Sequence, residues 1–541
     1  MQRFVLSSLV VLSLFLFSGV AQSQSSSPDP SPDPAAHGRL LLVLPFENHS
    51  FQPNLDWIGE GAADILNRRL DSAGFLTISR GDRLYALDRL GLPQTFQPSH
   101  ATTIRIAQTL DADSVVLGSC TITGNKLTAS AQILDVKALK LSPPLQQDGD
   151  LKNLLDILNG LAWRLARQLD PAYSVAQQTF FAADAPLRAD AFENYIRGMI
   201  AEAPAERIVH LKEAVRLDPS FTPAWFALGM AYFANQDYDS AAATFGRLPK
   251  EDSKALEADF YRGLSFFYTA NYMKAEDAFA FVSIRLPLPE VVNNQAVAAS
   301  RRGHDATALF QQAVTADPKD PDYRFNLAVS LRHRNDTQAA IREIDQELKL
   351  RPQDTEAQAF ENVLKDPGSV KLNPDRGKAI PDDTLPLERI KRSYNETGFR
   401  QAAFEMEQME AMRVASLPLH ERASALVKEG NQFMSGGFTL EAERQFQSAL
   451  QADPSSALAH AGLAQVREHS GDYDAARQEA QKSLALSPNV PAHLVLARLD
   501  LATNQLGTAA TEVAQALKLE PANANARGMK QALESRGQQV P

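Results

Sequence analysis

A period of 34 residues constrains the fold of this chain more than any other feature of its 541 residues. Between Ala224 and Phe245, aromatic, small and aliphatic residues stand at fixed intervals. The same residue types return 34 positions later, in the pairs Gly229 and Gly263, Tyr232 and Phe266, Ala241 and Ala275, and Phe245 and Phe279. Self-similarity at a fixed period indicates a stack of equal structural units, each of which buries its apolar face only against its neighbours.

The spacing within one period resembles that of tetratricopeptide repeats. The pattern W-x2-L-G-x2-Y…A-x3-F is matched by Trp225, Leu228, Gly229, Tyr232, Ala241 and Phe245. The resemblance implies two antiparallel helices per repeat and an all-α superhelical solenoid. We expect eight repeats, over about 188–221, 222–255, 256–289, 289–320, 321–354, 423–456, 457–489 and 490–523. Five of them fill 185–354, and three fill 423–535, where Ala522–Ser535 supplies a capping helix.

The first 38 residues have the composition of a signal peptide and a linker. Arg3 precedes the apolar stretch Phe4–Phe17, and small residues follow at Ala21 and Ser23, so we predict a signal peptide over 1–23. The apolar stretch is shorter than the roughly 20 residues of a membrane span, which favours cleavage over a retained anchor. The Ser/Pro/Asp-rich residues 24–38 are expected to form a disordered linker. We therefore predict an exported bacterial protein, periplasmic or associated with the cell envelope, without a membrane span after cleavage.

Residues 39–172 alternate between strand and helix patterns, which predicts an α/β domain. We expect strands over Leu40–Phe46, Phe75–Ser79, Ser114–Thr123 and Lys126–Val136, and helices over Leu55–Leu70, Asp82–Leu90, Thr102–Leu110 and Leu151–Leu169. The residues Thr123, Gly124 and Asn125 indicate a hairpin between the last two strands. The predicted fold is therefore an α/β N-terminal domain followed by the tetratricopeptide solenoid.

The order of these segments resembles the TolB amino-terminal type of domain, related in style to the FlgO and CsgG exported modules. The resemblance rests on LLVLPFENHS, DWIGEGAADILNRRL, FLTISR and IAQTLDADSVVLGSCTITGNKLTASAQILD, followed by a final helix. It implies a role in assembly and interaction, and it carries no set of catalytic residues over to this chain.

Residues 355–422 separate the two groups of repeats and lack the repeat pattern. The stretch 365–386 is rich in Pro, Gly and Asp and is expected to be a loop or linker. Leu387–Ala415 is rich in Glu and Met, and we expect it to be helical.

Signals for catalysis are weak in this sequence. It contains no phosphate-binding loop, dinucleotide-binding fingerprint, nucleophile elbow or H-E-x-x-H motif, so we predict no enzyme activity, cofactor or metal site. Glu47 and His49 follow an apolar strand, and we expect them to cap or line the next turn. The single cysteine, Cys120, is expected to be buried in a strand. The net charge of −11 disfavours nucleic acid as a partner.

The aromatic residues of the second and third repeats give the strongest functional signal. By the resemblance, positions 5, 9, 12 and 13 of each repeat line the concave groove. The residues predicted to form a partner-binding groove there are Phe226, Met230, Phe233, Phe260, Leu264, Phe267 and Tyr268. Such an apolar strip either binds a peptide or partner helix, or is covered by the N-terminal domain or the 387–415 segment.

Three functions remain open on the sequence alone. The favoured one is a non-enzymatic scaffold that binds peptides or partner proteins in the cell envelope. The second is a sensory or accessory subunit whose N-terminal domain binds a small ligand or docks on an envelope complex. The third is a hydrolase centred on Glu47 and His49. The sequence leaves the partner and the oligomeric state open.

Overall fold

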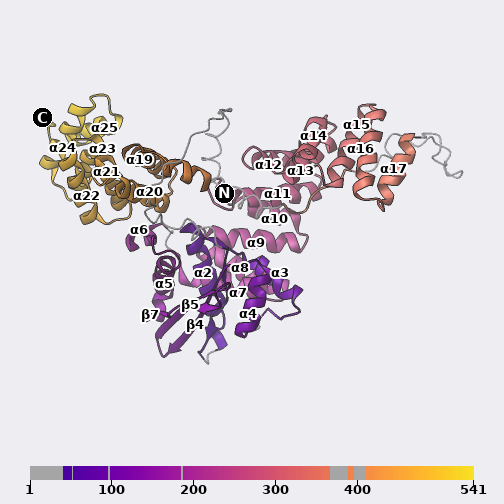
Figure 1. The fold of residues 1–541 in the computed structure, drawn as a ribbon, viewed down its shortest axis with the longest axis horizontal. Helices are drawn as coiled ribbons and strands as arrows, with labels where there is room; N and C mark the ends of the chain where they lie inside the picture. Colours follow the sequence, from indigo (N-terminus) through magenta and orange to yellow (C-terminus); the bar gives the residue numbers. More distant parts are fainter. Residues whose placement is uncertain (1–39, 51–52, 95–97, 184–186, 366–387, 395–407) are drawn as a thin grey trace, which may run out of the picture. The chain divides into compact units, whose positions relative to one another are not determined.

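The computed structural model describes residues 40–50, 53–94, 98–183, 187–365, 388–394 and 408–541 (Figure 1). The predicted signal peptide 1–23 and linker 24–38 lie outside the described residues. Contacts divide the chain into two compact units. One contains Arg197–Ala403, and the other joins Gln22–Ile196 to Phe404–Pro541. The α/β domain and the last repeats therefore share a unit, while the first repeats form their own.

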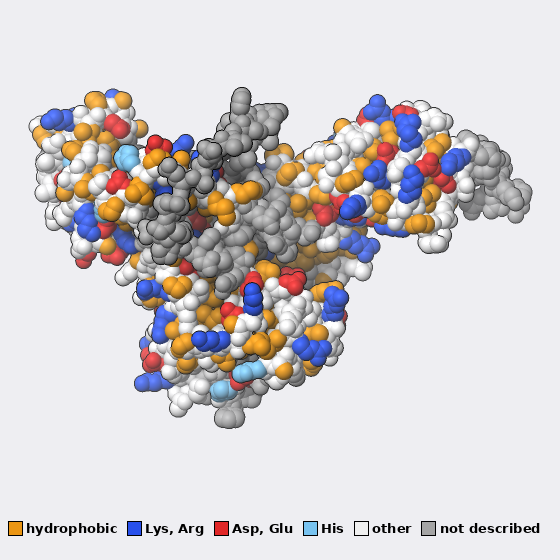
Figure 2. Space-filling view, viewed as in Figure 1, with side chains coloured by type: hydrophobic (Ala, Val, Ile, Leu, Met, Phe, Trp, Pro, Cys, Tyr) orange, Lys and Arg blue, Asp and Glu red, His pale blue; other side chains and the backbone are white. Residues whose placement is uncertain are grey.

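Within the described ranges, no helix has the length and apolar character needed to cross a membrane. On the face shown in Figure 2, basic and acidic side chains lie interspersed over the helices near the 321–365 end of the first repeats.

The N-terminal domain is built on a mixed sheet of seven strands. Its strands are β1 Leu40–Val43, β2 Glu47–Asn48, β3 Leu76–Thr77, β4 Ser114–Thr123, β5 Lys126–Asp135, β6 Lys140–Leu141 and β7 Leu145–Asp150. The central strand β1 pairs in parallel with β3 and β4, and β5 runs antiparallel to β4, β6 and β7. The polar strand β7 was not among the predicted strands, because pairing with β5 and packing of α5 stabilise it and its own sequence shows neither.

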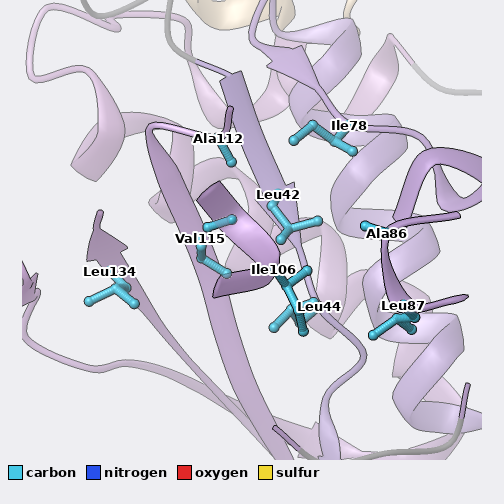
Figure 3. Packing of buried hydrophobic residues seen from close by; sticks show 10 residues of the cluster. Leu42, Leu44, Ile78, Ala86, Leu87, Ile106, Ala112, Val115 and Leu134 are labelled. Carbon is cyan, nitrogen blue, oxygen red and sulfur yellow. The ribbon is translucent and has the colours of Figure 1, made fainter. Parts of the chain in front are cut away.

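Alternation along the strands gives the sheet two apolar faces. Leu42 on β1 and Val115 on β4 belong to a buried cluster with residues of α3 (Arg80–Arg89) and α4 (His100–Thr109) (Figure 3). The helices α2 (Ile58–Ser72) and α5 (Leu154–Leu169) pack on each other and on strands of the sheet. The predicted helices of this domain are all present, with ends shifted by a few residues.

The predicted strand Leu40–Phe46 is wrong in its second half. Strand β1 ends at Val43, and the chain re-enters the sheet at β2, which pairs with Ser119 and Cys120 of β4. The break falls at Pro45, which has no N–H to donate to a ladder. The Phe46 N–H turns away and donates to the Gly59 carbonyl at 3.0 Å. Glu47 therefore begins a short strand where a turn was expected.

The first array, as we call helices α7–α17, consists of antiparallel helix pairs and a final single helix. Its helices are α7 Ala189–Ile200, α8 Pro204–Leu217, α9 Thr222–Ala234, α10 Tyr238–Phe245, α11 Ala255–Tyr268, α12 Tyr272–Ser283, α13 Pro289–Arg301, α14 Thr307–Ala316, α15 Pro321–His333, α16 Thr337–Leu350 and α17 Thr355–Lys365. The second helix of several pairs begins at a capping side chain, such as Asp237, Asn271 or Asp336, that accepts a backbone N–H of its first turn.

Small residues let the two helices of a pair approach, as the sequence predicts. A Cβ placed on Gly263 would lie 2.7 Å from the Phe279 ring, and one on Gly430 would lie 2.6 Å from the Phe446 ring. Both phenylalanine side chains are fully buried. Glycine is required at these positions because the partner ring fills the space of its missing side chain.

The second array, helices α19–α25, repeats this arrangement. Its helices are α19 Leu419–Ser435, α20 Thr439–Ala452, α21 Ala457–His469, α22 Tyr473–Leu486, α23 Val490–Ala502, α24 Leu506–Leu519 and α25 Ala524–Ser535. The segment that leaves the α/β domain, including α6 (Gln177–Ala182), contacts this array. The Ala176 N–H donates to Glu443 at 3.0 Å, and Arg467 donates to the Thr179 hydroxyl at 2.9 Å. The predicted fold class, an α/β domain followed by an α-helical solenoid, is thereby confirmed.

The region between the arrays differs from the prediction of a helix over Leu387–Ala415. Residues 388–394 have no helical structure, residues 408–415 are helical, and the part between them lies outside the described residues. Helix α17 occupies the start of the stretch that lacked a repeat pattern. Long-range bonds from the first array hold the backbone of residues 389–391, before a bend at Arg392, and these contacts outweigh the local preference for a helix.

Candidate functional site

The seven predicted groove residues lie on α9 and α11 of the first array. Phe260 and Leu264 are fully buried, and the other five are half-buried. Phe233 packs against Tyr261 and Tyr268 with ring centroids 5.4 and 6.1 Å apart. Phe226 packs against Phe245 at 5.8 Å. The seven residues belong to two apolar clusters that share Phe233, and the five half-buried ones remain accessible in part. Their role in binding a partner stays a prediction.

The chain itself supplies an occupant for the neighbouring part of this groove. Residues 388–394, which we call the docked segment, lie against α11, α13 and α15. The Tyr394 ring meets the Phe260 ring edge-on at 4.8 Å, and Ile390 packs against the same apolar cluster. Cover from the 387–415 region was one of the two alternatives left open by the sequence, although a helix was expected there.

Three buried asparagines hold the backbone of the docked segment. Asn326 on α15 accepts the Arg389 N–H at 2.6 Å and donates to the Arg389 carbonyl at 2.7 Å. Asn294 on α13 does the same for Lys391, at 2.8 and 2.7 Å. Asn293 adds a bond to the Arg389 carbonyl at 3.0 Å and accepts from Asn326. Asn326 and Asn294 therefore each pair with both backbone groups of one residue, as a neighbouring β-strand would.

Alternation along the docked segment sends the side chains of Arg389 and Lys391 to one side. The Arg389 guanidinium donates to both oxygens of Asp354, at 2.9 and 3.0 Å, and to Glu356 at 2.8 Å. It also lies 3.7 Å from the centre of the buried Phe325 ring. A two-pronged ion pair over an aromatic face is a recognition geometry that arginine provides and lysine does not.

Lys391 and Glu388 complete the polar contacts. The Lys391 ammonium donates to Asp320 and to Asp322, both at 2.7 Å. The Glu388 carboxylate accepts a bond from the Ser300 hydroxyl and pairs with Arg301 at 3.3 Å. Arg392 and Ser393 are exposed. The groove therefore binds the side chains of Arg389 and Lys391 and leaves Arg392 and Ser393 in contact with solvent.

The pKa values of the groups in and beside these ion pairs are strongly shifted. Burial tends to lower the pKa of Arg389, but hydrogen bonds to Asp354 and Glu356 outweigh burial and raise the pKa above its usual range. Burial tends to raise the pKa of Asp354, and the bonds from Arg389 lower it overall. Burial, with the negative charge of Asp354, raises the pKa of Glu347 to about 7. The Glu347 carboxylate lies 3.7 Å from the Arg389 guanidinium, which counteracts that rise.

The sequence analysis missed the asparagines, although a signal for some of them was present. Applied to the fourth repeat, 289–320, the groove positions 5, 12 and 13 are Asn293, Ser300 and Arg301. All three contact the docked segment. Asn294 and Asn326 each lie at position 6, outside the expected set. The groove was predicted from aromatic side chains, and these positions carry polar ones.

The residues considered for catalysis lie in the α/β domain. The His49 ring and the Glu47 carboxylate are 3.2 Å apart, and both side chains are about half exposed. Cys120 is buried in β4, where burial raises the pKa of its thiol to about 12. Among the residues that the structure describes, no group of three or more His, Cys, Asp or Glu side chains is placed to hold a metal ion.

Comparison with family models identifies tetratricopeptide repeats in both arrays. One model matches residues 295–355 and 427–491, and a second matches 197–259. A comparison with curated proteins finds no match. The N-terminal α/β domain is matched by neither family model.

Solved structures that resemble parts of the chain have low sequence identity. A MamA RS-1 ArsTM double mutant is 19% identical, with 31% of this chain and 99% of that chain covered and a TM-score of 0.29. YrrB, described as a TPR protein with an unusual peptide-binding site, is 15% identical, with 37% and 98% covered and a TM-score of 0.29. The LpoB C-terminal domain from Escherichia coli is 23% identical, with 22% and 87% covered and a TM-score of 0.20.

Tetratricopeptide repeats form a protein-interaction fold, and proteins that contain them bind peptides or other proteins. The predicted period, phase and helix pairs agree with the matched segments. The chain therefore carries tetratricopeptide repeats over 197–259, 295–355 and 427–491.

Proposed function

We propose that this chain is a non-enzymatic interaction scaffold whose first array holds an extended segment of a partner protein. The observation that carries the proposal is the pairing of Asn294 and Asn326 with both the N–H and the carbonyl of alternate residues in the docked segment. Contacts to backbone groups accept any extended sequence, so the same groove suits a segment of another protein.

Charge supports a protein partner over a nucleic acid. Asp320, Asp322 and Asp354 face the segment, and carboxylates at these positions repel a phosphate backbone. The aromatic surface of α9 and α11, with Phe233 and Phe267, extends the same side of the array and supplies apolar contact area. These residues are the predicted partner-binding set, and they remain part of the proposal.

The proposal places the scaffold in a bacterial cell envelope. Its support is the sequence of residues 1–23, which has the three regions of a signal peptide. We further propose that the α/β domain, which resembles the TolB amino-terminal type, docks the scaffold on an envelope complex. Neither role requires catalysis by Glu47 or His49.

A crosslinking experiment in the native host tests the proposal. A photo-crosslinking amino acid at position 267 of the full chain captures the bound protein, and mass spectrometry locates the captured segment. The triple variant Asn293→Ala/Asn294→Ala/Asn326→Ala should reduce the capture of that segment at least tenfold, because each lost pair weakens backbone binding.

The matched control is Gln312→Ala, which changes an exposed amide on α14 of the same array and should leave capture unchanged. Equal capture by the triple variant and the control would show that the groove does not hold the partner.

A further inference from the structure

We propose that the docked segment is an internal ligand that closes the groove, and that the partner which displaces it carries an extended basic segment. The required pattern is an arginine and a lysine two residues apart with an apolar residue between them. This inference rests on the proposed function and adds the chemical class of the partner and the way access is controlled.

The groove around the docked segment carries a concentration of negative charge. Asp320, Asp322, Asp354 and Glu356 all bond to the two basic side chains of the docked segment. From the array itself, Arg351 bonds to Asp322 at 2.8 Å and to Asp354 at 3.3 Å. Replacement of Arg389 and Lys391 by neutral residues would leave this group of carboxylates without two of its cations. Like charges at such distances repel, so the empty groove favours a ligand that restores both.

Different residues of the groove contact the backbone and the side chains of the docked segment. The asparagines bond to the backbone and do not distinguish one side chain from another. Asp354, Glu356 and the Phe325 ring contact the arginine side chain and select for it. The two carboxylates around Lys391 select for the lysine. Arg389 and Lys391 are two residues apart, as in any extended chain whose side chains point the same way. Ile390, between them, packs against the apolar cluster. Specificity for arginine, an apolar residue and lysine follows from these contacts.

A free ligand can replace the docked segment in the groove. The docked segment is short, contains two exposed residues, and is joined to α17 through residues 366–387. A ligand that belongs to the same chain has an effective concentration on the order of 1 mM at its site. A free peptide must compete with this internal ligand, so it binds the closed chain more weakly than the open groove. The segment therefore excludes weak ligands and yields to strong or multivalent ones.

A binding experiment with the full chain tests both parts of the proposal. The probe is a fluorescein-labelled peptide with the sequence of residues 387–394, LERIKRSY, and fluorescence anisotropy measures its affinity. The variant Arg389→Glu/Lys391→Glu reverses the charges of the internal segment and opens the groove. Its matched control, Arg342→Glu/Lys349→Glu, makes the same charge change at exposed positions on α16.

We expect the opened chain to bind the peptide at least tenfold more tightly than the wild type and the control. A second peptide, with glutamate in place of its first arginine and of its lysine, should bind the opened chain at least tenfold more weakly. Adding Asn294→Ala/Asn326→Ala to the opened chain should abolish binding, which places the peptide in the groove.

The possible negative results of the peptide-binding experiment contradict different parts of the proposal. Equal affinity of the opened and wild-type chains would overturn the internal-ligand claim. Equal affinity of the opened chain for both peptides would overturn the charge preference and leave the proposed scaffold function standing, because backbone contacts alone would account for binding. Failure to bind either peptide would overturn the inference as a whole, and the crosslinking experiment would still decide the proposed function.

If the opened variant does not fold, the wild-type chain gives the answer. Peptide at millimolar concentration should expose the amides of Arg389 and Lys391 to hydrogen exchange. Unchanged exchange at saturating peptide would contradict displacement.

Discussion

Asparagine at three buried positions converts a helical surface into a partner for an extended chain. The side chains of Asn293, Asn294 and Asn326 are fully buried, and burial of a carboxamide is costly unless its donors and acceptor are paired. The docked segment supplies those partners. At the same scale, glycine permits the close helix contacts that keep the repeats in register. Single residues therefore determine both the packing of the array and what it can hold.

Gly263→Ala tests the packing at this scale. The added methyl group would lie 2.7 Å from the Phe279 ring, which has no free space to move into because it is fully buried. We expect a loss of about 1–3 kcal/mol in the free energy of unfolding. Thermal unfolding followed by circular dichroism should show a lower Tm.

Gly528→Ala is the matched control for that substitution. Nothing lies within 4 Å of a Cβ at this helical position, so alanine should stabilise α25 by about 0.5–1 kcal/mol. A Tm that falls equally in both variants would contradict the account of Gly263.

At the scale of elements, the helices were predictable and the docked segment was not. Most helices of the repeats carry a local signal, a period of apolar residues, and some add a cap such as Asp336. Each pair packs on its neighbour in sequence. The docked segment contains Glu, Arg and Lys, which favour helices, yet its backbone partner Asn326 lies more than 60 residues away. The break at Pro45 and strand β7 likewise depend on partners that local patterns do not reveal. The repeat places Asn293 at a groove position, and the 387–415 region was one of the covers that the sequence left open. The extended form of this cover and its bonds to Asn294 and Asn326 could not be predicted from local patterns.

The charge of Glu347 couples docking to pH. Burial and Asp354 raise the pKa of Glu347 to about 7 with the segment docked, and Arg389 counteracts the rise. Loss of Arg389 removes this lowering influence, so for unchanged burial of Glu347 we expect its pKa to rise and docking to release protons. The stabilisation of the docked state is therefore present above the pKa of the empty groove and is lost as the pH falls through about 7.

We expect the peptide LERIKRSY to bind the opened chain more tightly at pH 8 than at pH 6. If the docked and empty grooves differ by one pKa unit, the effect is about tenfold. Glu347→Gln in the opened chain removes the titrating group, so the pH dependence should largely disappear. Identical pH profiles with and without Glu347 would exclude this coupling.

At the scale of the whole molecule, the chain joins parts that are distant in sequence. The α/β domain shares a compact unit with the second array through residues near Ala176 and Thr179. Glu443 lies at the centre of this junction, fully buried, and pairs with Arg467 at 2.7 Å. The other unit, Arg197–Ala403, contains the rest of the first array from the end of α7 onward, together with the docked segment. The residues that hold the docked segment therefore all lie within one compact unit.

Arg467→Ala tests the junction within the second unit. Loss of the arginine leaves the buried Glu443 charge without its cation, and such a loss costs about 3–5 kcal/mol. Urea unfolding followed by circular dichroism should show a clearly lower midpoint for this unit. Arg413→Ala removes a solvent-exposed pair with Glu410 and should leave the midpoint close to that of the wild type. Similar midpoints for the two variants would mean that Glu443 is not held in the buried pair.

The central claim is that the first array binds an extended segment through its backbone, and hydrogen exchange of the full chain tests it most directly. The amides of Arg389 and Lys391 donate to Asn326 and Asn294, although residues 388–394 have no secondary structure of their own. Residue-resolved exchange should show both amides protected at least 100-fold relative to a free peptide, and Asn294→Ala/Asn326→Ala should remove the protection. Exchange of these two amides at free-peptide rates in the wild-type chain would contradict the claim.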